Sequence, residues 1–252
     1  MKKRKFLYHK FAICILLLFL LIGCATVYNP VTRREERTMY TVEQEIALGK
    51  QVAEQVESQN EICEEKNDYV NRIGQLVAAN SDRPDIPYSF KVIDSAEINA
   101  FALPGGFIYI HKGLLDILEE PEVAAVLGHE IGHVAARHGI KRIQAVYGYQ
   151  LIAVLALAAI GDKAEMRQLH EIADNIFTLV VLGYSRKDEF QADRLGTIYT
   201  HCSGYDPRAM IRVLEKLGEQ SRGRQITFLS THPPIEDRIK QVEIVIAALE
   251  SE

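Results

Sequence analysis

The segment His129-Glu130-Ile131-Gly132-His133 limits what this chain can fold into more than any other stretch of the sequence. Pro121 and Gly139 flank it, which predicts a helix from about Glu122 to His138. Two histidines four positions apart lie about 40° apart on one helix face, so both imidazoles can reach one metal ion. Glu130 can then act as general base on a water molecule beside that ion, as in zinc hydrolases.

A helix with two surface histidines is the alternative interpretation, and a third ligand must decide between the two. One large class of zinc hydrolases has a third histidine ten residues after the first, where this chain has Gly139, so that class is excluded. His138 lies nine residues after His129, roughly 180° round a continuous helix. We therefore assign His138 to the helix C-terminus, where a cation or a carbonyl partner is favourable.

The candidate third ligand is Glu189, which lies four residues before Asp193 on a helix expected from about Arg186 to Tyr199. Carboxylates at this spacing share one helix face. We predict that Glu189 binds the metal and that Asp193 accepts a hydrogen bond from a ligand histidine, which fixes its tautomer. A solvated acidic face is the alternative, but the histidine helix upstream favours the metal site.

The hydrophobic pattern predicts a mainly helical α+β domain over residues 41–252. Further helices are expected at about Val42–Glu57, Asn67–Ala79, Ala164–Leu182, Arg208–Leu217 and Ile235–Leu249, and strands at Tyr88–Ile93, Ile98–Leu103 and Phe107–His111. Pro104-Gly105-Gly106 predicts a hairpin-like turn between the last two strands. The apolar stretches Leu151–Ile160 and Ile176–Val181 are expected to be buried helices, with a hairpin that covers the active site or touches the membrane as the alternative.

The N-terminal residues predict export and lipid attachment. Residues 1–23 combine a basic start with a short apolar run and read as a signal peptide; a short membrane anchor helix is the alternative. Leu21-Ile22-Gly23-Cys24 is similar to the bacterial lipobox, in which the cysteine is acylated. Residues 24–40 would then be a polar tether. Ala25 after the cysteine favours the outer membrane over the inner one, with the domain facing the periplasm.

The net charge limits the kinds of partner that the chain can bind, and the cysteines matter because the chain is expected to be exported. Removing residues 1–23 takes away five basic residues and no acidic one, which leaves 24 basic against 34 acidic side chains. This excess of negative charge argues against a nucleic-acid partner. Cys63 and Cys202 remain in the exported chain, where a disulfide or two buried free thiols are both open interpretations.

Four stretches of the chain are similar to one known enzyme family: Asn99-Ala-Phe-Ala-Leu-Pro-Gly-Gly106, Leu127-Gly-His-Glu-Ile-Gly-His133, Tyr184-Ser-Arg-Lys-Asp-Glu189 with Ala192-Asp193, and Ser230-Thr-His-Pro-Pro234. In this order they resemble the HtpX, BepA and CAAX-prenyl-protease type of zinc metallopeptidase, from about Gln44 to the end. The resemblance implies a gluzincin-like core, in which an active-site helix packs against a small sheet and a second helix supplies the carboxylate ligand. Beyond the signal peptide we expect no membrane span, and we expect no helical-repeat extension of the kind that some of these relatives carry.

The resemblance implies a zinc-dependent endopeptidase with one Zn²⁺ per chain, which acts on unfolded or misassembled envelope proteins. It suggests that the sheet edge, near Phe101 to Phe107, pairs with an extended polypeptide substrate, and that Asn99, Ala100, Phe101 and Ala102 contact this substrate. It also suggests that His232 occupies the fourth metal position in a latent state or stabilises the oxyanion during turnover; a structural loop histidine is the alternative. A latent protease that acts mainly as a chaperone-like assembly factor for outer-membrane proteins is the competing function. Arg238 is expected to pair with a carboxylate.

Overall fold

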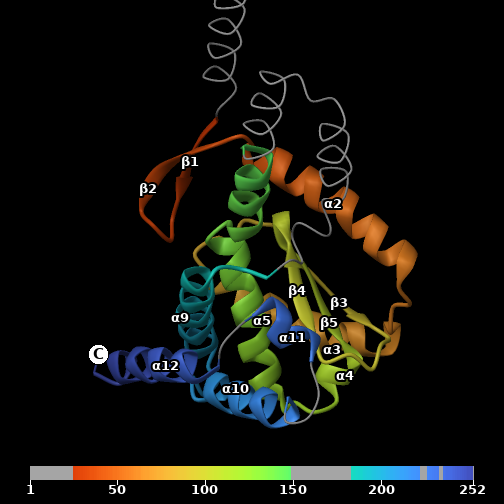
Figure 1. Cartoon of the computed structure of the whole chain (residues 1–252), viewed down its shortest axis with the longest axis vertical. Helices are drawn as coiled ribbons and strands as arrows, with labels where there is room; N and C mark the ends of the chain where they lie inside the picture. Colours follow the sequence, from red (N-terminus) through yellow and green to blue (C-terminus); the bar gives the residue numbers. More distant parts are fainter. Residues whose placement is uncertain (1–24, 149–182, 222–225, 233–234, 252) are drawn as a thin grey trace, which may run out of the picture.

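The structure is a computed structural model that describes residues 25–148, 183–221, 226–232 and 235–251 of the 252-residue chain (Figure 1). Its elements are β1 (Ala25–Asn29), β2 (Arg34–Thr38), α2 (Val42–Gln59), α3 (Glu64–Ala79), β3 (Ser89–Ile93), β4 (Ala100–Leu103), η1 (Pro104–Gly106), β5 (Phe107–His111), α4 (Lys112–Leu115), α5 (Glu120–Ala135), α9 (Arg186–Cys202), α10 (Ala209–Gln220), α11 (Thr227–Thr231) and α12 (Ile235–Leu249). The predicted mainly helical α+β class is confirmed. The signal peptide, Cys24, the predicted helix Ala164–Leu182 and both long apolar stretches lie outside the described residues.

The helix α5 lies at the centre of the fold, between a three-stranded sheet and α9 (Figure 1). The strand order is β3-β5-β4, with β3 parallel and β4 antiparallel to β5, so β4 is an edge strand of this sheet. The predicted hairpin-like turn between β4 and β5 is present as η1. The helix α3 packs against β3 and α5, while α10 and α12 pack against α5 and α9 respectively.

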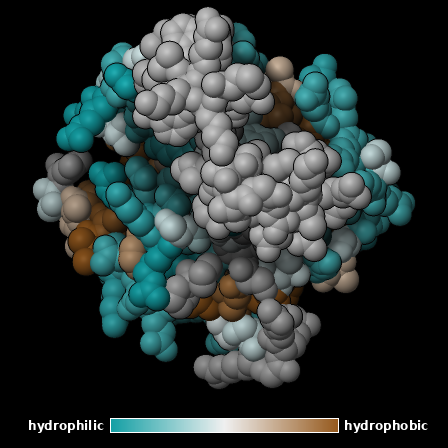
Figure 2. All heavy atoms as spheres, turned by 45° about the horizontal axis from the view of Figure 1, so that its top comes forward, coloured by the Kyte–Doolittle hydropathy of each residue, from teal (hydrophilic) through white to brown (hydrophobic). Residues whose placement is uncertain are grey.

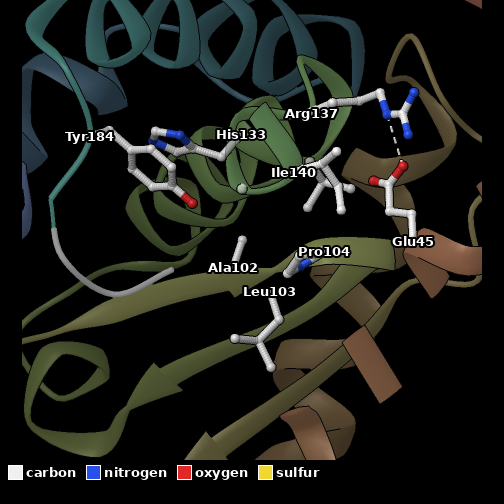
Figure 3. Close-up of a pocket in the computed structure, with 10 residues that line it drawn as sticks. Glu45, Ala102, Leu103, Pro104, His133, Arg137, Ile140 and Tyr184 are labelled. Atoms are coloured by element: carbon white, nitrogen blue, oxygen red, sulfur yellow. Dashed lines mark hydrogen bonds and ion pairs between the residues drawn. The ribbon is translucent and has the colours of Figure 1, made fainter. Parts of the chain in front are cut away.

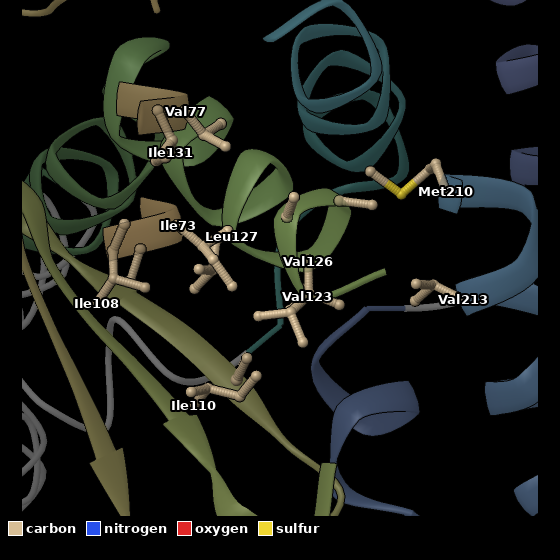
Figure 4. Close-up of a cluster of buried hydrophobic side chains, with 14 of the residues drawn as sticks. Ile73, Val77, Ile108, Ile110, Val123, Val126, Leu127, Ile131, Met210 and Val213 are labelled. Carbon is tan, nitrogen blue, oxygen red and sulfur yellow. The ribbon is translucent and has the colours of Figure 1, made fainter. Parts of the chain in front are cut away.

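A single apolar core holds α5 in this position (Figure 4). Its central side chains come from α3, β5, α5 and α10: Ile73, Val77, Ile108, Ile110, Val123, Leu127, Ile131, Met210 and Val213. Every α5 residue from Glu122 to Ala135 is buried. The histidines and Glu130 of this helix therefore lie in a low-dielectric interior, where electrostatic interactions are stronger than in water.

The helix α5 begins as the sequence predicts and ends earlier. Glu119 and Glu122 form a reciprocal capping box, and Pro121 lies in the first turn. The helix stops at Ala135, and a second helical stretch runs over residues 138–148. The expected continuation to His138 is therefore wrong, and Gly139 lies inside the following helix. The physical reason is Arg137, whose φ of 60° interrupts the right-handed helix.

The stretch expected to be a tether contains an antiparallel hairpin, β1–β2, which the hydrophobic pattern did not predict. The hairpin contacts the helical stretch over residues 138–148: Lys141 lies 3.1 Å from Glu36, and Thr38 donates a hydrogen bond to Gln144. On the face shown in Figure 2 the described surface is mainly hydrophilic. Among the described helices, none has the length and apolar character that a membrane crossing requires.

The two cysteines that remain in the described structure are free thiols. Cys63 is half-buried and Cys202 is exposed. The disulfide interpretation is therefore not supported, and the alternative of two buried thiols does not fit Cys202 either.

Candidate metal centre

Four buried side chains from three separate parts of the chain converge on one point. His129, His133, Glu189 and His232 each offer one ligand atom, and these atoms all lie within 4.8 Å of one another. The two Nε2 atoms of the α5 histidines are 3.0 Å apart, and they lie 3.5 and 3.7 Å from the nearer Glu189 oxygens. Ligands about 2.0 to 2.1 Å from a tetrahedral Zn²⁺ are roughly 3.3 Å from each other. The observed spacing therefore fits one small cation with nitrogen and oxygen ligands.

Glu189 reaches the two histidines because α9 approaches α5 unusually closely. A Cβ on Gly132 of α5 would lie 3.0 Å from the carbonyl oxygen of Ala192. A Cβ on Gly196 of α9 would lie 2.6 Å from the backbone nitrogen of His129. A side chain at Gly196 would force the backbone apart, and one at Gly132 would require a shift of a few tenths of an ångström, so glycine permits the contact that places the carboxylate beside the imidazoles.

The protonation states of the cluster suit metal binding. Burial lowers the pKa of His133 well below its ordinary value, and the neighbouring His129 adds to the effect, so the ring is neutral and can offer a lone pair. Burial acts to raise the pKa of Glu189, but His232 and other neighbours outweigh it and lower the pKa. Glu189 is therefore an anion, as a metal ligand must be.

Asp193 lies behind His129, where the sequence predicts a partner for a ligand histidine. Its Oδ1 is 2.9 Å from His129 Nδ1, on the side of the ring opposite the converging ligand atoms. Arg238 donates to both carboxylate oxygens of Asp193 at 2.7 Å and lies 3.2 Å from Glu189 Oε2. Burial acts to raise the pKa of Asp193, yet Arg238 outweighs it and keeps the carboxyl ionised. The expected pairing of Arg238 with a carboxylate is thus present.

Glu130 lies in the cluster with both carboxylate oxygens buried and without a hydrogen-bond partner among the described residues. Such groups are rare in folded proteins and often have a catalytic role. Burial raises the pKa of Glu130 to about 7, and the charge of Glu189 adds to the rise. A carboxylate with this pKa can both accept and return a proton near neutral pH.

His232 comes from the loop after α11 and completes the cluster. Its Nδ1 lies 2.8 Å from Glu189 Oε1 and 3.3 Å from His129 Nε2. The ring stacks on Phe228 with 4.4 Å between centroids, and Arg238 donates to the His232 carbonyl oxygen. The backbone of Phe228 donates to Ile98 just before β4, so this loop is tied to the sheet.

Sequence reasoning missed two further side chains that contact His133. His138 is not among the converging ligand atoms, as expected, but its Nδ1 lies 2.9 Å from His133 Nδ1. Its expected position on the far side of a continuous helix is wrong, because the helix is interrupted at Arg137. Tyr184 stacks on the His133 ring with 3.9 Å between centroids (Figure 3). Tyr184 belongs to the stretch that ends at Glu189, so its position next to a predicted ligand helix was the available signal.

A small pocket opens beside His133, between the end of β4 and the helical stretch over residues 138–148 (Figure 3). Ala102, Leu103 and Pro104 line one side, and His133, Tyr184 and Ile140 line the other. Of the four residues predicted to contact substrate, Ala100, Phe101 and Ala102 lie on the edge strand, and Asn99 directly precedes it. Asn99 Oδ1 is buried without a partner among the described residues.

The chain is similar to several known metalloproteases. The model of peptidase family M48 matches residues 64–245, which is more than half of the chain and includes all four converging side chains. Metalloprotease YcaL of Escherichia coli is 26% identical over 205 residues, which is 80% of each chain. Metalloprotease LoiP of the same organism is 29% identical over 77% of each chain. A putative beta-barrel assembly-enhancing protease of Vibrio cholerae is 31% identical over 79% of this chain and 43% of its own length.

Proposed function

This chain is a metalloendopeptidase that belongs to peptidase family M48, and we propose that it hydrolyses peptide bonds with one zinc ion bound by His129, His133 and Glu189. The observation that carries the proposal is the convergence of these buried ligand atoms within 4.8 Å. Zinc is preferred because two imidazoles and one carboxylate form a typical catalytic zinc site that leaves one position open. The buried carboxyl of Glu130 beside the cluster, whose pKa is raised to about 7, supports the same conclusion.

The residues around this site have different roles in hydrolysis. When bound, zinc would polarise the scissile carbonyl and lower the pKa of a water molecule towards 7. The Glu130 carboxylate would accept a proton from the attacking water molecule and then give a proton to the nitrogen of the leaving amine. Asp193 and Arg238 hold His129 and Glu189 in place. Tyr184 stays protonated because burial, together with the charge of Glu130, raises the pKa of its hydroxyl.

The substrate that fits this arrangement is an extended polypeptide. The edge strand β4 contacts the active-site helix, so a chain paired with β4 would run past Glu130. We assign substrate contacts to Asn99, Ala100, Phe101 and Ala102 on this basis. Unfolded or misassembled proteins expose far more extended chain than folded ones do, so they are the expected substrates.

The expected location is the periplasmic face of a bacterial membrane, with the outer membrane preferred, through lipid on Cys24. The beta-barrel assembly-enhancing proteases act, by their name, in β-barrel assembly, and the chain spans about two fifths of their length. Quality control of envelope proteins is therefore the physiological role that we propose. Radiolabelled palmitate should be incorporated into the wild-type chain in bacteria and not into Cys24→Ser; equal labelling would exclude this anchor.

The position of His232 favours a resting state with low activity. Its Nδ1 lies among the other ligand atoms, where it would take the fourth position and leave no room for water. For turnover the loop after α11 must then move away. The same observation supports the second candidate function, a chaperone-like assembly factor that binds outer-membrane proteins along the edge strand β4 and cleaves them rarely.

Zinc quantification combined with casein cleavage tests the proposal. The wild type should contain one zinc per chain. Glu130→Gln should retain zinc and lose cleavage by at least about 100-fold, as removal of a general base does. Glu215→Gln, an exposed helix carboxylate, is the matched control. A wild type without stoichiometric zinc, or a Glu130→Gln variant that cleaves at nearly the wild-type rate, would contradict the assignment.

The variant His232→Ala separates the two candidate functions. A strong rise in casein cleavage with zinc retained would show that His232 holds the protease latent. A loss of cleavage with zinc retained would assign His232 to oxyanion stabilisation and exclude latency. Suppression of aggregation of an unfolded outer-membrane protein by Glu130→Gln, at the wild-type level, would favour the chaperone-like function.

A further inference from the structure

His138 is held between a ligand histidine and the helix that supplies the carboxylate ligand. Its Nδ1 lies 2.9 Å from His133 Nδ1, and its Nε2 lies 3.1 Å from the side-chain oxygen of Gln191 on α9. Asp188 Oδ1, on the same helix, is 3.5 Å from this Nε2. The ring is buried, so water does not compete for these contacts. His138 thus forms a polar bridge from α9 to the side of His133 that faces away from Glu189.

This arrangement exists only because the helix is interrupted. The two histidines are five positions apart, which would place them about 140° apart on a continuous helix. Arg137, at φ 60°, turns the chain between them. Its guanidinium is bound by Glu45 of α2 at 2.9 Å and donates to the Tyr40 carbonyl oxygen, so the backbone is fixed in this unusual conformation. The next residue, His138, therefore points back to the metal centre.

The proton positions in this bridge follow from the ligand role of His133. When Nε2 of His133 binds a metal, its ring proton lies on Nδ1, which is then a donor. His138 Nδ1 must accept that hydrogen bond, so the proton of His138 lies on Nε2 and is donated to Gln191 Oε1. Every polar atom of both rings has a partner in this one assignment. The reverse assignment would place a proton on His133 Nε2, where metal binding is impossible.

We propose that His138 is a positioning residue that fixes the tautomer and ring orientation of His133. The role of His138 towards His133 is the same as the role of Asp193 towards His129. Both depend on α9, because Gln191 of α9 contacts His138 and Asp193 is itself a residue of α9. The inference rests on the proposed zinc site, because it concerns the affinity of that site for its ion. Outer partners of this kind typically change metal affinity by about 10- to 100-fold.

Zinc affinity of a matched pair of variants tests the proposal, measured by competition with a chromophoric chelator. His138→Asn keeps an acceptor near the Nδ1 position and should weaken zinc binding less than threefold. His138→Leu removes the acceptor and should weaken binding by about 10- to 100-fold. His201→Leu, at an exposed histidine of α9, is the control and should bind as the wild type does. Equal affinities of the Leu and Asn variants would overturn the proposal.

The tautomers give a second readout that needs no variant to fold. Long-range ¹⁵N–¹H spectra of the zinc-loaded wild type should show His133 protonated at Nδ1 and His138 protonated at Nε2. A His138 ring protonated at Nδ1 would refute the inference even if zinc is bound. Zinc content of the wild type tests the metal site separately: a protein that binds no zinc fails the proposed function, whereas stoichiometric zinc with equal variant affinities fails only the role of His138.

Discussion

Gly196 of α9 lies against the backbone of His129 of α5, so closely that a Cβ on the glycine would meet the His129 nitrogen at 2.6 Å. This contact sets the separation of the two helices that carry the candidate ligands. Glu189 lies two turns before Gly196 on the same helix, so any shift of α9 moves the carboxylate away from the imidazoles.

The variant Gly196→Ala should therefore damage both stability and metal binding. Overpacking of this contact is expected to cost about 1 to 3 kcal/mol and to weaken zinc binding at least tenfold. Gly148→Ala is the control, since a Cβ there has no atom within 4 Å and a helical alanine is favourable. Urea unfolding and chelator competition measure the two effects. Zinc affinity unchanged in Gly196→Ala would show that the helix contact does not position Glu189.

The ion pair between Asp193 and Arg238 predicts coupled effects of substitution. Asp193→Asn leaves a buried guanidinium with less compensation and should cost about 3 to 5 kcal/mol of stability. Arg238→Met alone should cost a similar amount, because it leaves the carboxylates unpaired. The double variant should be less destabilised than the sum of the two single variants. Additive losses in urea unfolding would mean that the two residues act independently.

Glu130 predicts a specific pH dependence of the metal-free protein. Burial raises its pKa from 4.5 to about 7, so the folded state retains a proton that the unfolded chain releases in this range. Stability should therefore fall as the pH rises from about 4.5 to 7, by at most about 3 kcal/mol. Glu130→Gln removes this titration. After EDTA treatment, the variant should gain stability relative to the wild type between pH 5 and 8, as measured by urea unfolding; a constant difference would refute the raised pKa.

At position 137 we expect a glycine substitution to give a more stable protein than an alanine substitution, which is the reverse of the order inside a helix. Both substitutions break the pair with Glu45, but only alanine must still adopt a positive φ, at a cost of about 1 kcal/mol relative to glycine. Arg137→Gly should therefore be more stable than Arg137→Ala. Lys141, in the helical stretch that follows, is the control, and there alanine should be the more stable substitution. If alanine gave the higher melting temperature at both positions, the helix break would not depend on the positive φ of Arg137.

Those parts of the candidate site that lie within one helix could be predicted from residue type and spacing. The spacing of His129 and His133 follows from helix geometry, and Glu189 and Asp193 share a face for the same reason. The edge position of β4 followed from the likeness of the Asn99 stretch to a known family and not from the residues alone. The hairpin β1–β2 escaped prediction because its strands are polar, and its contacts are made with residues more than 100 positions away.

His138 shows where local reasoning fails. The sequence places it on the far side of a continuous helix, and the nearby helix-end signal, Gly139, lies after His138 and not before it. The interruption occurs at Arg137, and Glu45, which lies 92 positions earlier in the chain, binds its guanidinium and supports a backbone conformation that is unfavourable for arginine.

The sequence by itself determined the ligand chemistry, the helix that carries two imidazoles and the mainly helical class, because each of these depends on residue type and on periods of a few residues. The tertiary structure decided which side chains meet: it brought Glu189 and His232 to the α5 histidines, and it turned His138 back towards His133. These meetings depend on the close packing of α5 against α9 and on a buried ion pair between distant segments. Contacts of this kind are set by the free energy of the whole core, which no short window of sequence contains.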